Sequence, residues 1–242
     1  MDEDGPVLGR LAALVTAIAV LTGCAGGPPE TPREEASTGC PAVEIVGIRG
    51  QGQSLEAHGG LGAEVEGISG LLAADLAPLG PVRTTAIRHA SRLGSWDQYV
   101  EDVRDGRERL RSRVRAVAQD CPDTRIAVIG FSQGSQIARE ELAARPRLAR
   151  HVDALVLVGS PQRDPAAPVP HVSLPGGVPP GGSRLGPGPD LGDLATRTVE
   201  ACSTGDIVCT TDGSDDTIHR HIYEEPQVAR AIADAAAAVL TE

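Results

Sequence analysis

The sequence predicts an α/β fold with a mostly parallel sheet of about five strands and helices on both faces. Short apolar runs alternate with helical patterns from residue 40 onward, and the run Ala154–Val158 is apolar at every position. Such strands are typical of parallel sheets, because helices bury them from both sides. No repeat and no second core pattern divides residues 40–242, so we expect one domain there, without a large cap.

The strands are predicted from short runs rich in β-branched and other apolar residues. Their expected ranges are 43–48, 82–87, 126–129 and 154–158, with a last short strand that begins at Thr198. Helices are predicted where apolar residues recur at three- and four-residue spacing or where alanine dominates. They cover 60–77, 97–119, a range that starts at Gln133, and 226–240, where Pro226 suits a helix start.

Residues 161–193 are rich in proline and glycine and match neither pattern. A loop of this length inside a compact domain is either functional or disordered. We therefore expect a surface flap or insertion beside the functional site.

Composition excludes several classes of function. The formal charge is −11 and aromatic residues make up 2% of the chain, which argues against a nucleic-acid binder. The sequence contains no lysine, so a Schiff-base enzyme and the usual P-loop are excluded. The low aromatic content also favours a substrate pocket lined by Leu, Val, Ile and Pro.

The N-terminal segment has the features of an export signal. Residues 11–23 form an uncharged apolar run, too short to cross a bilayer comfortably but suited to the centre of a signal peptide. The run ends in Leu21-Thr22-Gly23-Cys24, which resembles a bacterial lipobox, where the cysteine becomes the lipid-modified first residue. A buried helix that ends in a core cysteine is the alternative interpretation.

We accordingly expect a lipoprotein signal peptide over 1–23 and a flexible tether over 24–39, whose Pro, Gly and Glu residues cannot pack a core. The tether would anchor the protein to a membrane through a lipid on Cys24. The acidic residues 1–6 do not suit a signal peptide, and a translation start at Val7 would remove them.

Four cysteines remain, and an even number in an exported chain implies disulfides. Of the three possible pairings we prefer Cys202 with Cys209, which are close neighbours around a Gly-Asp turn, and therefore Cys40 with Cys121. On the chain-entropy model the long loop contributes about 4.5 kcal/mol and the short one about 2.5 kcal/mol. A zinc site is disfavoured, because neither a CxxC motif nor a closely paired histidine accompanies these cysteines.

The most informative motif is Gly130-Phe131-Ser132-Gln133-Gly134, between a predicted strand and a predicted helix. A GxSxG motif in this context is the nucleophile elbow of α/β-hydrolases. Its tight turn exposes the serine hydroxyl and directs the N–H of the next residue, Gln133, at the same space. The motif predicts Ser132 as a nucleophile, and a glycine-rich turn around a structural serine is the alternative.

A serine nucleophile needs a general base, and in this fold the order along the chain is serine, acid, histidine. His151 precedes a strand on the wrong side of the sheet, and His171 lies in the Pro/Gly-rich loop. His219 and His221 remain, in a predicted turn before the last helix, where the base is expected.

Asp206 is the preferred acid, because it lies in the loop that the pair Cys202 and Cys209 would close. A carboxylate held in a fixed position can orient an imidazole. Three aspartates lie nearer to the candidate bases, but in an unstapled polar stretch. We interpret these three as solvated charges: Asp212, Asp215 and Asp216.

From about residue 40 to 240 the chain resembles the cutinases and cutinase-like esterases of fungi and actinobacteria. The resemblance is carried by Gly39-Cys40, Arg49-Gly50, Cys121-Pro122, the GFSQG motif and CSTGDIVC at 202–209. It implies Ser132 as nucleophile, Asp206 as acid and the two disulfides given above. It also implies an oxyanion hole formed by the backbone N–H groups of Gln51 and Gln133.

Two departures from the family pattern concern the base and the oxyanion hole. The family usually has a histidine three residues before a tyrosine, but Arg220 holds that place before Tyr223, between His219 and His221. We prefer His219 as the base, with His221 as the alternative. The family usually has Ser or Thr where this chain has Gln51, which still offers its N–H.

The resemblance implies a secreted, lipid-anchored serine esterase that cleaves carboxylic esters through an acyl-enzyme. Short- to medium-chain acyl esters, lipids or polyesters are the implied substrates. We expect a monomer that uses no cofactor and no metal. A non-catalytic envelope-binding protein on the same fold, and an acyltransferase or thioesterase with the same triad, are the alternatives.

Overall fold

The structure is a computed structural model that describes residues 39–241 of the 242-residue chain. The predicted signal peptide, nearly all of the predicted tether and the candidate lipidation site Cys24 lie outside the described residues. The described part belongs to one compact unit of the chain.

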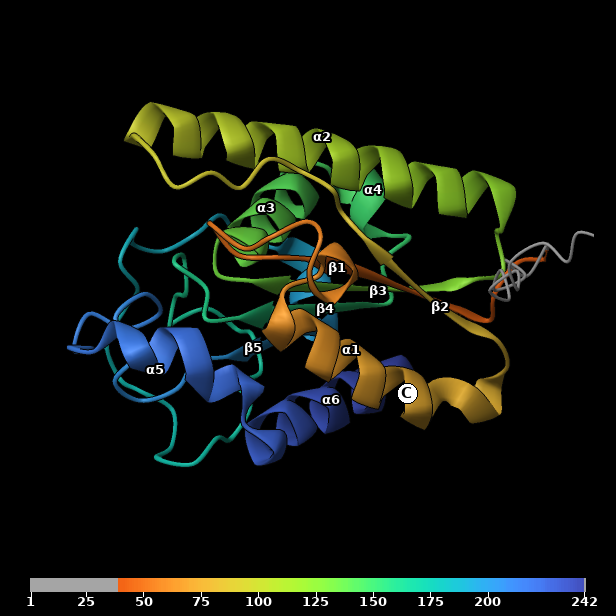
Figure 1. The fold of residues 1–242 in the computed structure, drawn as a ribbon. Coiled ribbons are helices and arrows are strands. Elements are labelled where there is room, and N and C mark those ends of the chain that lie inside the picture. The colour runs from red at the N-terminus through yellow and green to blue at the C-terminus, as the bar shows by residue number, and fades with distance from the viewer. Residues whose placement is uncertain (1–38, 242) are drawn as a thin grey trace, which may run out of the picture. The chain divides into compact units, whose positions relative to one another are not determined.

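Five parallel strands form a single sheet in the order β2-β1-β3-β4-β5 (Figure 1). The strands are β1 (Val43–Ile48), β2 (Val82–Ala86), β3 (Arg125–Phe131), β4 (Ala154–Val158) and β5 (Thr198–Ala201). All four neighbouring pairs are parallel, so the carboxyl ends of the strands share one edge of the sheet. The predicted α/β fold with five parallel strands is confirmed.

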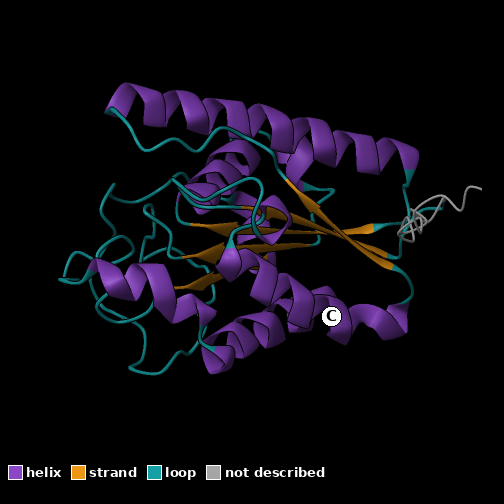
Figure 2. Ribbon diagram, in the orientation of Figure 1, coloured by secondary structure: helices purple, strands orange, loops and turns teal. Residues whose placement is uncertain are grey.

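Helices cover both faces of the sheet (Figures 1 and 2). One face carries α1 (Ala63–Leu76) and α6 (Pro226–Thr241), and the other carries α2 (Trp96–Asp120), α3 (Gln133–Ala143) and α4 (Pro146–Ala149). The remaining short helices are η1 (His58–Gly60), η2 (Ala77–Leu79), η3 (Gly192–Arg197), α5 (Asp216–His221) and η4 (Ile222–Glu224).

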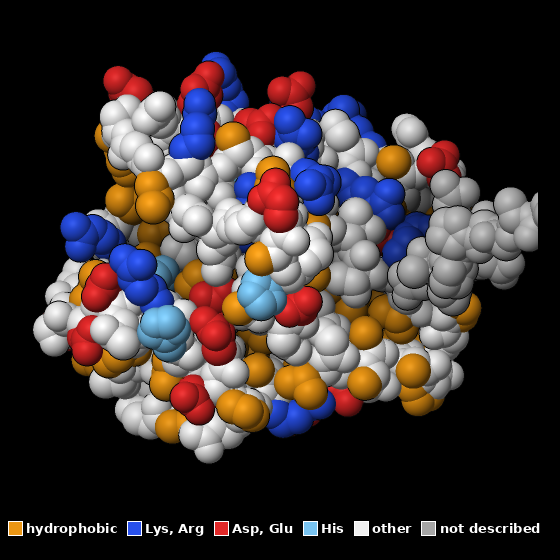
Figure 3. Space-filling model, in the orientation of Figure 1, with side chains coloured by type: hydrophobic (Ala, Val, Ile, Leu, Met, Phe, Trp, Pro, Cys, Tyr) orange, Lys and Arg blue, Asp and Glu red, His pale blue; other side chains and the backbone are white. Residues whose placement is uncertain are grey.

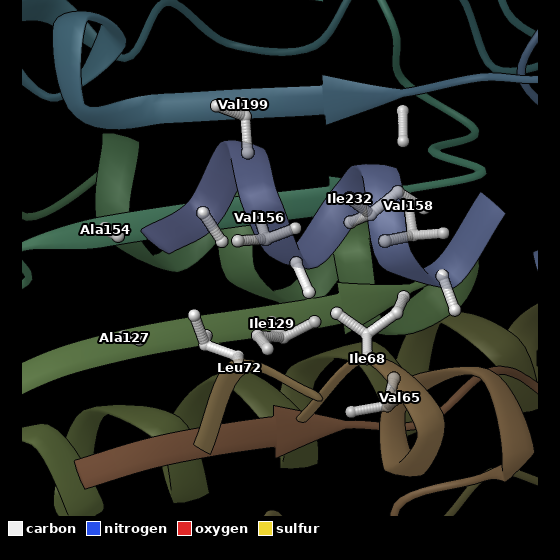
Figure 4. Close-up of a cluster of buried hydrophobic side chains, with 14 of the residues drawn as sticks. Val65, Ile68, Leu72, Ala127, Ile129, Ala154, Val156, Val158, Val199 and Ile232 are labelled. Atoms are coloured by element: carbon white, nitrogen blue, oxygen red, sulfur yellow. The ribbon is translucent and has the colours of Figure 1, made fainter. Parts of the chain in front are cut away.

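The core consists of two hydrophobic layers, one on each face of the sheet, because successive strand side chains point to opposite faces. Figure 4 shows the layer beneath α1 and α6, where Ile68 and Ile232 point toward Ile129, Val156 and Val158 of the sheet. Alternate residues of the same strands, such as Val128 and Leu155, belong to the layer under α2 and α3. This double burial explains why β4 is apolar at every position.

Helix α2 begins one residue before its predicted start. Ser95 caps it, since its side chain accepts a hydrogen bond from the N–H of Gln98, and Gln98 Oε1 in turn accepts one from the N–H of Ser95. Basic and acidic side chains are interspersed along this helix at the top of the face drawn in Figure 3. Ion pairs such as Arg109 with Asp105 link successive turns.

Both disulfides have the pairing that the sequence analysis gives. Cys40–Cys121 joins the residues before β1 to the end of α2. Cys202–Cys209 closes a short loop directly after β5. The sulfurs are therefore engaged in covalent bonds rather than in a zinc site.

The Pro/Gly-rich segment 161–193 lies beside the candidate site, but it is more than a surface flap. Buried apolar residues anchor it, among them Val172 and Leu174 in the core layer of α1 and α6. Arg163 is also buried, and its guanidinium donates hydrogen bonds to the carbonyl oxygens of Cys209 and Pro179 at 2.8 and 2.9 Å. These contacts fasten the segment to the disulfide-closed loop after β5.

Candidate active site

Ser132 lies in a tight turn between β3 and α3, with a backbone φ of +52°. A positive φ is uncommon for residues other than glycine and is maintained only where the surroundings enforce it. A Cβ at Gly130 would lie 2.5 Å from the backbone of Gly134, and a Cβ at Gly134 would lie 2.1 Å from the carbonyl oxygen of Ile48. The turn therefore requires both glycines of the motif.

Ser135, one turn into α3, fastens this elbow to the neighbouring strand. Its hydroxyl donates to the carbonyl oxygen of Gly130 at 2.6 Å and accepts from the N–H of Val158 at 3.0 Å. The N–H of Ser132 donates to the carbonyl oxygen of Val158 at 2.9 Å. Sequence reasoning did not single out Ser135, because its partners lie in another strand.

The side chains of Ser132, His219 and Asp206 form a continuous hydrogen-bonded chain. His219 Nε2 lies 2.9 Å from Ser132 Oγ, and His219 Nδ1 lies 2.9 Å from Asp206 Oδ2. Asp206 is buried, and the His219 side chain is 12% exposed. A hydroxyl next to an imidazole that a carboxylate orients is the arrangement that activates a serine for attack on a carbonyl.

The two candidate bases lie on a helix, so the prediction of a turn at this place is wrong. Helix α5 covers both residues, and side chains two positions apart on a helix point in very different directions. His219 faces the serine, whereas the His221 side chain is 66% exposed and lies 3.6 Å from Glu224 Oε1. The structure thus brings His219, and not His221, between Ser132 and Asp206.

Asp206 receives hydrogen bonds from three further donors. Its Oδ1 accepts from the N–H groups of Val208 and Cys209 at 2.7 and 3.3 Å, and its Oδ2 accepts from the Tyr223 hydroxyl at 2.6 Å. Burial by itself would raise the pKa of Asp206, but the hydrogen bond and electrostatic interaction with His219 and the hydrogen bonds from Tyr223 and Val208 hold it below its ordinary value. The carboxylate is therefore ionised at neutral pH.

Tyr223 has a role that the sequence did not reveal. In the sequence it indicated only where the family pattern places a histidine. Its buried hydroxyl donates to Asp206 and accepts from the N–H of Ser203 at 3.0 Å. Burial raises the pKa of Tyr223 well above its ordinary value, so the hydroxyl keeps the proton that it donates. The other nearby aspartates are exposed, and Asp215 caps α5 by accepting from the N–H of Thr217 at 2.8 Å.

The loop that carries Gln51 is held by buried polar contacts. Gln53 Oε1 accepts from the N–H of Gly50 at 2.7 Å, and Gln53 Nε2 donates to Glu64 at 2.6 Å. The buried Arg49 donates to the carbonyl oxygen of Gln53 at 2.9 Å. The Gln51 side chain donates to the carbonyl oxygen of Arg92 at 2.9 Å.

A cavity of about 320 Å³ opens beside Ser132. Its lining residues are Gln51, Gly94, Ser95, Trp96, Tyr99, Ser132, Pro161, Arg184, Leu185 and Val208. A larger hollow, of about 600 Å³, is lined by the end of α2 and by residues 144–151 around α4, and contains no serine or cysteine. Within residues 39–241 no group of three or more His, Cys, Asp or Glu side chains could bind a metal ion.

The expectation of a pocket without aromatic walls is wrong. The chain has only four aromatic residues of the Phe, Trp and Tyr types, and all four lie at this site. Trp96 and Tyr99 line the cavity with their rings stacked 5.1 Å apart. Phe131 stacks on His219 at 4.9 Å, and Tyr223 meets the edge of Phe131 at 5.8 Å.

Comparison with known proteins gives a consistent result. The family model described as Cutinase matches residues 39–238. Carboxylesterase Culp1 of Mycobacterium tuberculosis is 26% identical over 203 residues, which cover 83% of this chain and 81% of that protein. Cutinase CUT1 of Coprinopsis cinerea is 31% identical over 109 residues, which cover 44% of this chain and 42% of that protein.

Solved structures show a similar fold. The catalytic core domain of acetyl xylan esterase from Trichoderma reesei has a TM-score of 0.62 at 20% identity, with 81% of this chain and 99% of that chain covered. A cutinase-like protein from Cryptococcus sp. has a TM-score of 0.63 at 15% identity, with 84% and 94% covered. At these identities the likeness supports the fold alone.

Proposed function

This chain belongs to the cutinase family and is a carboxylic-ester hydrolase, and from this premise we propose that it is a serine esterase that uses Ser132, His219 and Asp206. The observation that carries the proposal is the position of His219, whose two ring nitrogens each lie 2.9 Å from an oxygen of the other two residues. The resemblance that the sequence analysis found is confirmed by the family match.

In the proposed reaction Ser132 Oγ attacks the ester carbonyl while His219 Nε2 takes the hydroxyl proton. His219 then gives this proton to the departing alcohol oxygen, and the acyl group stays on Ser132 as an ester. Water attacks that acyl-enzyme and gives a proton to His219, which passes it to the departing Ser132 Oγ as the acid is released. Asp206 remains ionised throughout and stabilises the imidazolium that forms twice in each cycle.

The oxyanion of both tetrahedral intermediates would be bound by the backbone N–H groups of Gln133 and Gln51. Gln133 is the first residue of α3, and the first N–H groups of a helix have no acceptor inside it. The loop of Gln51 is held by Gln53 and Arg49, which supports a preorganised second donor. Loss of one such donor costs about 3–4 kcal/mol in comparable sites.

Short- to medium-chain acyl esters are the proposed substrates, including those of lipids or polyesters. A cavity of about 320 Å³ beside the serine has room for a chain of this kind. Its apolar walls include Trp96, Leu185 and Val208, which would contact hydrocarbon.

We further propose that the protein is exported, with a signal peptide over 1–23, a tether over 24–39 and the hydrolase domain over 40–242. Two disulfides fit an oxidising compartment. In the part that the structure describes, no helix is long and apolar enough to span a membrane. The proposed attachment to the membrane is a lipid on Cys24, which follows the lipobox-like residues.

Metabolic labelling with a fatty-acid analogue tests the proposed anchor. We expect the wild-type protein to incorporate the label and to sediment with membranes. Cys24→Ala should lose the label, because Cys24 is the cysteine that directly follows Leu21-Thr22-Gly23. A wild-type protein that is unlabelled and wholly cytosolic would contradict the lipoprotein interpretation and leave the esterase proposal standing.

Labelling with a fluorophosphonate tests the nucleophile itself. We expect the wild type to form one phosphonyl adduct, located on Ser132 by peptide mass spectrometry, and Ser132→Ala to form none. Ser95→Ala is the matched control, because Ser95 lines the same cavity and its loss should leave the adduct in place. A folded wild type that resists the reagent would refute the proposed function, and product analysis with added alcohol separates hydrolysis from acyl transfer.

A further inference from the structure

Arg184 brings a positive charge into the cavity of the candidate active site. It is the one charged residue among the ten that line this cavity, which contains no carboxylate. Arg184 is exposed, and within residues 39–241 no carboxylate oxygen lies within 4.0 Å of its guanidinium. A cationic residue therefore lines the space into which an ester must enter to reach Ser132.

The backbone on which Arg184 stands is fixed. The N–H of Arg184 donates to the carbonyl oxygen of Val208 at 2.9 Å, and the N–H of Leu185 donates to that of Pro161 at 2.9 Å. Ser183 Oγ donates to the carbonyl oxygen of Arg163 at 3.0 Å. The N–H of Val208 donates to Asp206 Oδ1, so Val208 links the backbone of Arg184 to the candidate triad through two hydrogen bonds.

Many arginines of this chain, whose formal charge is −11, form ion pairs with carboxylates. Arg92, Arg107 and Arg113 each form ion pairs with carboxylates, at 2.9 Å between Arg107 and Glu140 for example. Arg184 has no such partner among the described residues, so its hydrogen-bond donors remain available to a ligand.

We propose that Arg184 selects esters whose acyl or alcohol part carries an anionic group, a carboxylate or a phosphate. The inference rests on the proposed esterase function and deepens it. A guanidinium matches the two oxygens of such a group with two parallel N–H donors. Trp96, which is 60% exposed, and Leu185 would contact the hydrocarbon between the ester bond and the charge.

Two pairs of substrates of matched size test the proposal from both sides of the ester. On the acyl side, the mono-4-nitrophenyl ester of adipic acid is compared with 4-nitrophenyl heptanoate. On the alcohol side, 4-butyryloxybenzoate is compared with 4-butyryloxybenzamide. The measured quantity is the ratio of kcat/KM for the anionic ester to kcat/KM for its neutral counterpart.

We expect Arg184→Gln to lower this ratio about tenfold for at least one pair, as expected for the loss of a charge-assisted hydrogen bond in a half-open site. Arg184→Lys should retain part of the preference, because it keeps the charge without the planar fork. Arg184→Glu should lower the ratio further, and added salt should reduce the wild-type ratio. Arg147→Gln, an exposed arginine beyond the far end of α3, is the matched control and should leave both ratios unchanged.

Equal ratios for the wild type and Arg184→Gln with both pairs would overturn the inference while the esterase function stands. The same holds if Arg147→Gln lowers the ratios as much as Arg184→Gln does, since the effect would then follow the net charge of the protein. If folded wild type hydrolyses none of the four esters, the proposed function fails and the inference fails with it.

Discussion

Replacing Ser132 or His219 with alanine is expected to lower kcat for a neutral ester about 10⁶-fold, as in serine hydrolases where nucleophile and base act as a unit. Without His219 the hydroxyl keeps its proton, and without Ser132 the imidazole has nothing to activate. The double variant should therefore be no slower than either single variant. Initial rates with 4-nitrophenyl butyrate, corrected for spontaneous hydrolysis, measure all three.

His221→Ala is the matched control for this prediction, because its side chain is exposed and faces away from the serine. We expect its kcat to stay within about twofold of the wild type, as is usual for surface substitutions. Full activity in His219→Ala together with inactive His221→Ala would reverse the assignment of the base. Full activity in both would mean that neither histidine is the base.

Asp206→Asn is expected to lower kcat about 10⁴-fold while the fold is preserved. Asparagine has the shape of aspartate, but its amide group would present N–H donors to His219 Nδ1, which favours the wrong tautomer of the imidazole. Unchanged circular dichroism would establish that the protein is folded. Activity close to that of the wild type would show that another group orients the histidine.

The lowered pKa of Asp206 also affects stability at acidic pH. The ionised carboxylate stabilises the folded state fully above the unfolded pKa of about 3.9, and this contribution is lost as the pH falls through the lower folded pKa. The unfolding free energy of Asp206→Asn should therefore change less below about pH 4 than that of the wild type.

The strands could be predicted because residues buried between two layers of helices form short runs rich in β-branched and other apolar residues. The predicted limits of β1 and β4 coincide with the observed ones, and the apolar run of β4 is bounded by Asp153 and Gly159. Strand β3 continues two residues beyond its predicted end, because Gly130 and Phe131 of the elbow still pair with Leu157 and Val158 of β4. The first two residues of the GxSxG motif, Gly130 and Phe131, are therefore part of the sheet rather than of the turn.

Helix α5 could not be predicted from its own residues. It has six residues, and apolar residues do not recur in it at helical spacing. In the sequence, its N-cap Asp215 cannot be told from the other aspartates of this polar stretch. The contacts of Tyr223 and Arg184 were equally hidden, because a hydrogen bond to Asp206 or a place in a cavity arises only when distant segments meet. The sequence predicts which groups could do the chemistry, and the fold decides which of them meet.

The sheet order has a consequence for refolding. Ser132 and His219 are 87 residues apart along the chain, and the loop of Asp206 follows β5, the strand at the β4 edge of the sheet. Contacts between such distant segments form slowly, because the loop-closure entropy must be overcome first. With the proposed triad, turnover would begin only once the last strand has docked, and we expect the recovery of hydrolysis to be slower than the recovery of helical signal in a refolding time course.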